Sequence, residues 1–66
     1  MKNYPDLPVF HYIREHAPVA KVVIAAGLDM DIAAVERALA ALLEAGMIGI
    51  AGYAPNDHPL YSPLDS

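Results

Sequence analysis

Apolar residues recur at steps of three and four through the middle of the chain, between Leu28 and Ile48. This spacing places them on one side of an α-helix, so the stretch predicts an amphipathic helix. Asp29 or Asp31 can cap the start of this helix, and Gly46 can end it. The predicted buried face consists of Leu28, Ile32, Val35, Leu39 and Leu42.

A shorter helix is predicted ahead of it, from about Leu7 to His16. Asp6 can cap this helix, and Pro8 suits its first turn, where a backbone N–H has no helical partner in any case. The helix ends because Pro18 cannot continue it and disfavours helical backbone at Ala17. Its predicted inward residues are Val9, Phe10 and Ile13.

A second short helix is predicted between Pro18 and Gly27, because proline suits the first turn of a helix and glycine often ends one. In this interpretation Ile24 points outward. Three consecutive β-branched residues, 22–24, would also suit a strand, which is the alternative for this segment. The predicted inward residues of the helix are Val19, Val22, Val23 and Ala26.

A β-hairpin is predicted after the long helix. Residues 46–53 form its first strand, with Ile48 and Ile50 facing one way. Residues 54–59 contain two prolines and an Asn-Asp pair, which are typical of a turn. Residues 60–62 then form the returning strand.

The predicted fold is therefore α+β and mostly α: three helices followed by a C-terminal two-stranded β-hairpin, in a single domain over residues 1–66. Residues 1–5 show no periodicity and are expected to form a loose N-terminal arm, and residues 64–66 a frayed tail. Twelve of the apolar residues are alanines, which bury little area each, so the core is small. A second subunit would add buried surface.

The order of elements, and above all the segment VERALAALLEAGMIGI followed by a hairpin, resembles the winged helix-turn-helix superfamily. The likeness covers about residues 7–62 and includes the pattern Val-x-x-Ala-Leu-x-x-Leu-x-x-x-Gly-x-Ile. It implies a three-helix winged helix-turn-helix fold in which the hairpin is the wing. Because each position of the pattern is also explained by packing, the pattern predicts a fold more than an activity.

Members of that superfamily most often bind DNA, with the third helix in the major groove and the wing on a neighbouring backbone or minor groove. The resemblance thus implies a small stand-alone transcriptional regulator. Arg37 could contact guanine or phosphate, and Lys21 could contact a phosphate. The implied DNA-binding residues are Arg37, Lys21, Ala33, Ala34, Asn56 and His58.

The net charge of −4 opposes this function, because eight acidic residues face four basic ones. DNA affinity depends on neutralising several phosphates, so a monomer with two or three available cations should bind weakly. Asp29 and Asp31 would repel a phosphate near the start of the third helix. A homodimer would double the cations and could align two reading helices about 34 Å apart.

A protein-protein interaction module with little or no DNA binding is the alternative function. Alanine-rich helix faces let another helix come close, although alanine is also the strongest helix former and needs no functional reason. A third possibility is an acidic protein that occupies the DNA-binding cleft of another protein. The candidate protein-interface residues are Ala34, Ala41, Leu43 and Ile24.

The sequence predicts no catalytic, metal or cofactor site. It holds no cysteine or threonine and only two serines, which leaves few nucleophiles for an enzyme. His11 and Glu15 share one side of the first helix, but a zinc site needs three or four converging ligands. No stretch approaches the about 20 apolar residues of a membrane span, and the first residues lack the apolar run of a signal peptide. We therefore expect a cytoplasmic protein without membrane contact.

Overall fold

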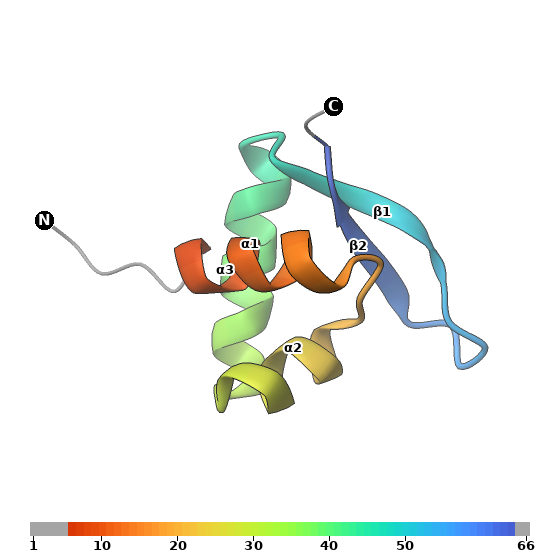
Figure 1. Cartoon of the computed structure of the whole chain (residues 1–66), viewed down its shortest axis with the longest axis horizontal. Helices are drawn as coiled ribbons and strands as arrows, with labels where there is room; N and C mark the ends of the chain where they lie inside the picture. Colours follow the sequence, from red (N-terminus) through yellow and green to blue (C-terminus); the bar gives the residue numbers. More distant parts are fainter. Residues whose placement is uncertain (1–5, 65–66) are drawn as a thin grey trace, which may run out of the picture.

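The computed structural model describes residues 6–64 and confirms the predicted fold class: three helices followed by a two-stranded antiparallel hairpin (Figure 1). The N-terminal arm predicted for residues 1–5 lies outside the described residues, as do residues 65 and 66 of the predicted tail. The elements are α1 (Asp6–His16), α2 (Lys21–Leu28), α3 (Ile32–Glu44), β1 (Ile48–Tyr53) and β2 (Pro59–Pro63).

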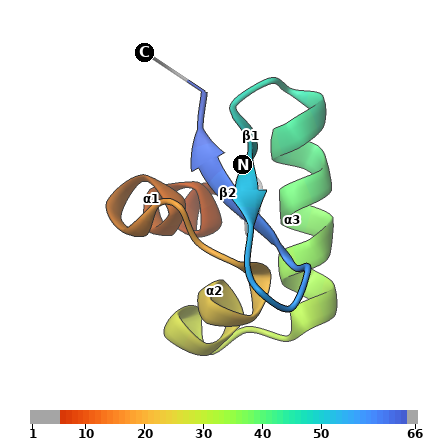
Figure 2. The ribbon, with the colours of Figure 1, turned by 90° about the vertical axis from the view of Figure 1, so that its right-hand side faces the viewer.

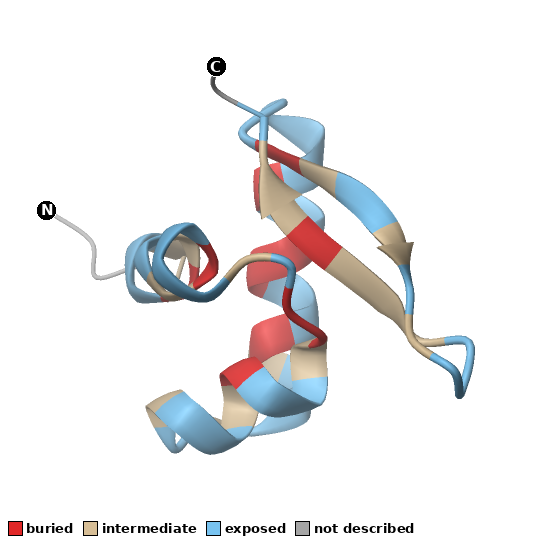
Figure 3. Ribbon diagram, turned by 45° about the vertical axis from the view of Figure 1, so that its right-hand side comes forward, coloured by how far each residue is buried: buried red, intermediate tan, exposed pale blue. Residues whose placement is uncertain are grey.

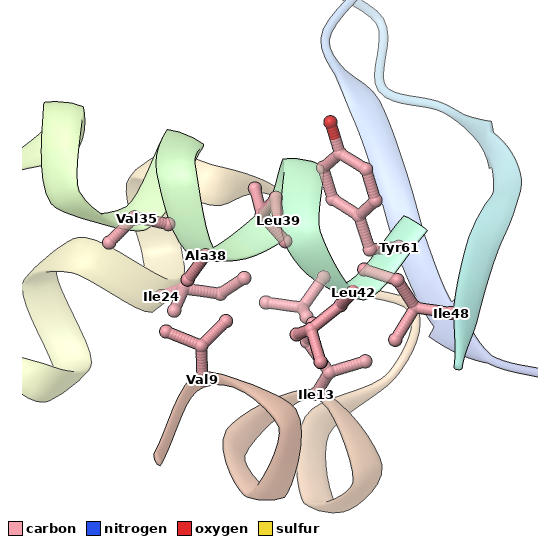
Figure 4. Packing of buried hydrophobic residues seen from close by; sticks show 10 residues of the cluster. Val9, Ile13, Ile24, Val35, Ala38, Leu39, Leu42, Ile48 and Tyr61 are labelled. Carbon is pink, nitrogen blue, oxygen red and sulfur yellow. The ribbon is translucent and has the colours of Figure 1, made fainter. Parts of the chain in front are cut away.

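The centre of the core is α3, which packs against α1, α2 and β1. Figure 3 shows the buried residues of the three helices turned toward one another. From α1, Val9 and Ile13 are fully buried as predicted (Figure 4). Phe10 is half-buried and packs against the core cluster. The third helix, α3, ends where the sequence predicts, and Gly46 just beyond it has a left-handed conformation (φ 75°). The buried residues of α3 are Val35, Ala38, Leu39 and Leu42.

The buried face of α3 is shorter than predicted. Leu28 is the last residue of α2, and Ile32 is 40% exposed at the start of α3. These residues belong to separate helices because Asp29 adopts a left-handed conformation (φ 55°) that ends α2. Asp31 then holds the N-cap position of α3, and its carbonyl accepts the N–H of Val35 at 3.1 Å.

The predicted orientation of the second helix is wrong. Val19 lies outside the helix because its backbone pairs with that of Tyr61, and α2 begins two residues later. The inward side of α2 therefore follows steps of four from Ala20 through Ile24 to Leu28. Ile24 is fully buried. This contradicts the prediction that Ile24 points outward. Val19 is buried as predicted, but the three residues predicted inward within the helix are exposed: Val22 (49%), Val23 (48%) and Ala26.

Gly27 lies inside α2 and does not end it. The ring of Tyr12 in α1 lies against this glycine so closely that a Cβ atom at position 27 would overlap it. Tyr12 is also stacked on His16, with the ring centroids 4.1 Å apart. The absence of a side chain at position 27 therefore lets α1 and α2 approach through the tyrosine ring.

A pair of backbone hydrogen bonds ties the hairpin to the helices. The N–H of Val19 donates to the carbonyl of Tyr61 at 3.0 Å, and the N–H of Tyr61 donates to the carbonyl of Val19 at 2.8 Å. Tyr61 belongs to the core cluster, with its hydroxyl directed away from the other residues drawn (Figure 4). The pairing occupies the edge of β2 that faces away from β1.

The hairpin is antiparallel, and a bulge interrupts its register between Ile50 and Gly52. Of the two isoleucines predicted on one face, Ile48 is buried and Ile50 is 48% exposed. Leu64, which the sequence places in a frayed tail, donates its N–H to the carbonyl of Met47 at 2.9 Å. The hairpin is therefore closed at the end that joins α3.

Replacing Gly27 with alanine is expected to destabilise the fold. Alanine gains about 1 kcal/mol of helix propensity over glycine. Overlap with the Tyr12 ring costs about 1–3 kcal/mol, so the free energy of unfolding should fall by up to about 2 kcal/mol in urea denaturation.

Two variants separate this overlap from a general intolerance of alanine. Gly52→Ala should change the stability little, because nothing lies within 4 Å of a Cβ atom there. In a Tyr12→Ala background, Gly27→Ala should become neutral or stabilising. Equal destabilisation in both backgrounds would show that the tyrosine ring does not set the cost.

Candidate binding surface

The side of α3 opposite its buried residues is exposed and combines alanines with the charged residues Glu36, Arg37 and Glu44. Ala33 and Ala40 are exposed there, and Ala34 is partly buried on the flank. Arg37 is exposed and makes no ion pair with any residue in the range 6–64. Because small side chains allow close approach, this face could meet another molecule, but Arg37 is its single basic group.

Lys21, the other implied phosphate ligand, is held in an ion pair. Its Nζ atom lies 2.6 Å from Oε2 of Glu36 in α3. The hydrogen bond to Glu36 raises the pKa of Lys21 above its usual value of 10.5, although desolvation acts in the opposite sense. A phosphate would have to compete with the carboxylate for this ammonium group, which weakens Lys21 as a DNA contact.

The turn between the two strands holds both implied wing contacts. Asn56 is exposed, and its side-chain oxygen accepts the backbone N–H of His58 at 3.3 Å. Asp57 lies between them with a positive φ of 69°. Figure 1 shows this turn projecting from the body of the molecule. It therefore presents an amide and an imidazole beside an acidic residue.

The predicted protein-interface residues are only partly available on the surface. Ala41 and Leu43 are exposed, and Ala34 is partly buried. Ile24 is fully buried, so the prediction that it meets a partner is wrong. Its burial follows from the start of α2 at Lys21, which turns position 24 toward the core.

Several large apolar side chains are exposed around the junction of α3 and the sheet, and of these the sequence identified only Leu43. Met47 directly precedes β1, and Leu64, which directly follows β2, donates its backbone N–H to the carbonyl of Met47. Leu64 also covers Gly49, since a Cβ atom there would meet the leucine side chain at 2.9 Å. We name this region the apolar end; its exposed residues are Leu43, Met47, Ile50 and Leu64.

Charge is distributed unevenly over the described residues. Residues 6–64 contain three basic and seven acidic side chains, which give a net charge of −4. Nine of these ten lie within residues 6–44, and Asp57 in the turn is the exception. The hairpin and its flanks, residues 45–64, thus combine almost no charge with exposed apolar side chains. The sequence signal for this surface is the uncharged run over residues 45–56.

Other kinds of site are not found in the described range. Residues 6–64 form no pocket, and they bring together no group of three or more potential metal ligands. His11 and His16 are exposed on α1. Among the helices between residues 6 and 44, none combines the length and apolar character needed to cross a membrane.

No protein-family model, no curated protein and no solved structure matches this chain.

Glu36→Gln should lower the pKa of Lys21 toward 10.5, because the hydrogen bond to Glu36 is the largest cause of its elevation. NMR titration of the lysine side chain measures this shift. Since the pKa is raised in the folded state, any stability from the pair is present below about pH 10.5 and is lost as the pH rises through the raised value.

Glu44→Gln is the matched control, because it removes the same charge from α3 without removing a partner of Lys21. It should leave the pKa of Lys21 unchanged. An equal shift in both variants would mean that net charge, and not the hydrogen bond, controls this pKa.

Proposed function

We propose that this chain is a protein-interaction module and that the apolar end is its contact surface. The observation that carries the proposal is that three of these exposed apolar side chains, Met47, Ile50 and Leu64, lie in the least charged part of the described residues, with Leu43 two residues before it. Complete burial of one such side chain contributes about 1.5–3 kcal/mol. Because these four are already partly buried, each contributes less, and the surface must act as a whole.

The charge distribution supports a protein partner over a nucleic acid. The positive charge of Lys21 in α2 is paired with the carboxylate of Glu36. Arg37 is the exposed basic residue of α3. DNA affinity arises largely from several neutralised phosphates, and a surface with net negative charge lacks this contribution. An apolar, uncharged surface suits a protein partner, because interface cores are depleted in charged residues.

Charge insertion at the apolar end tests the proposal. The full chain carrying an affinity tag is expressed in its source cells, and captured proteins are quantified against the untagged background. Leu43→Glu should lower the captured amount of a specific partner by at least about tenfold, because it places a carboxylate in the contact. Circular dichroism checks that the helices remain formed.

Ala40→Glu is the matched control, since it adds the same charge at another exposed position of α3. It should retain the partner. A partner lost equally from both variants would contradict the apolar end as the contact, and the absence of any protein sensitive to Leu43→Glu would contradict the function.

DNA binding is a second candidate function, and the exposed Arg37 on an alanine-lined helix face favours it. The order of three helices and a hairpin resembles the winged helix-turn-helix superfamily, in which this helix reads the major groove. In this function Arg37 would contact a base edge or a phosphate. The chain would then act as a small transcriptional regulator, most effectively as a dimer.

Fluorescence anisotropy with a pool of random DNA duplexes at low salt tests this candidate. Glu36→Gln should tighten binding by about tenfold, because it both removes a negative charge and releases Lys21. Glu44→Gln should tighten it less, since it removes only the charge. If neither the natural chain nor Glu36→Gln binds any duplex, the chain does not act on duplex DNA.

A further inference from the structure

Among residues 6–64, one edge of the sheet has no backbone partner. The sheet consists of β1 and β2, and the other edge of β2 pairs with Val19, so pairing ends at β1. Figure 2 views the molecule from the hairpin side, with β1 toward the viewer. Within residues 6–64, no backbone group pairs with β1 along its outer edge. Such an edge is a ready template for another strand.

Few features protect this edge. Natural edge strands are usually protected by charged side chains or proline, and Ile48–Tyr53 contains neither. The bulge between Ile50 and Gly52 is the one irregularity, and it leaves three regular residues, 48–50, before it. Ile50 is 48% exposed beside them. A short segment of pairing therefore has both free backbone groups and an apolar side chain available.

We infer that the apolar end binds a second copy of this chain, with β1 pairing antiparallel to β1 of that copy. The inference rests on the proposed function, for which it names the partner. Antiparallel pairing of two identical edges obeys twofold symmetry, so each copy donates and accepts the same hydrogen bonds. The exposed apolar side chains beside the edge then meet their symmetry mates.

The uneven distribution of charge favours a second copy of this chain as the partner. A chain with a net charge of −4 repels its own copy wherever the charged surfaces meet. Contact centred on residues 45–64 keeps most of the described charged residues away from it, with Glu44 beside Leu43 at its margin. A basic protein or a nucleic acid would gain no opposite charge from this surface, whereas a second copy needs none.

The available area also suits a second copy. A standard interface buries about 800 Å² per partner, which is about a fifth of the 4312 Å² exposed by this chain. Residues 45–64 are 20 of the 59 described residues. An interface centred on the hairpin and its flanks would therefore leave the outer face of α3 free.

Sedimentation equilibrium of the full chain between about 10 µM and about 1 mM tests the inference, since weak interfaces dissociate in this range. The mean mass should rise from 7.1 kDa toward twice that value. Ile50→Glu should raise the dimer Kd at least about tenfold, because it places a carboxylate in the contact. Val22→Glu is the matched control, because Val22 is equally exposed on α2 and gains the same charge; its Kd should stay within about twofold.

Ala51→Lys provides a second variant in case Ile50→Glu weakens the hairpin, because Ala51 is exposed. It lowers the negative charge, which alone would favour association, so a weaker dimer identifies the β1 edge as the contact. A monomer at about 1 mM, or a dimer weakened equally by Val22→Glu, overturns the inference. If such a monomer still loses a captured protein on Leu43→Glu, the proposed function stands and its partner is another protein.

Discussion

The two hydrogen bonds between Val19 and Tyr61 hold the hairpin against the helices, and the arrangement of the outer surface depends on them. They keep Val19 extended, so α2 begins at Lys21 and Ile24 turns into the core. They also bring Tyr61 into the core cluster and occupy the outer edge of β2. Because that edge is taken, the edge of the sheet that stays open belongs to β1, beside the exposed apolar side chains.

Local spacing along the chain predicted the features that local forces determine. The inward side of α3, its end at Gly46 and the turn of the hairpin all follow from periodicity and from the backbone preferences of single residues. The orientation of α2 could not be predicted in this way, because it depends on a contact between Val19 and a strand near the other end of the chain. Gly27 was misassigned for a similar reason: its contact is a tyrosine ring in another helix.

In the candidate site, too, local patterns predicted some features, while others depend on contacts between distant segments. Arg37 is exposed on α3 and Asn56 lies in the turn, as the helical and turn patterns predict. The ion pair of Lys21 with Glu36 joins two helices, so it could not be predicted from the sequence of either helix alone. The apolar end likewise combines residues of α3 and β1 with the residues that precede β1 and follow β2, although the uncharged run over residues 45–56 signals it in the sequence. These long-range contacts weaken Lys21 as a phosphate ligand and leave apolar side chains exposed around the end of α3.

Amide hydrogen exchange at residues 19 and 61, measured by NMR in a dilute sample, tests the central claim most directly. If the pairing fixes the hairpin, the amides of Val19 and Tyr61 should exchange only through global unfolding, with the same free energy as the amide of Leu39 in the core. Exchange of either amide at the rate of an unprotected peptide would contradict the account, because the hairpin would then open independently of the helices and the outer edge of β2 would also be open.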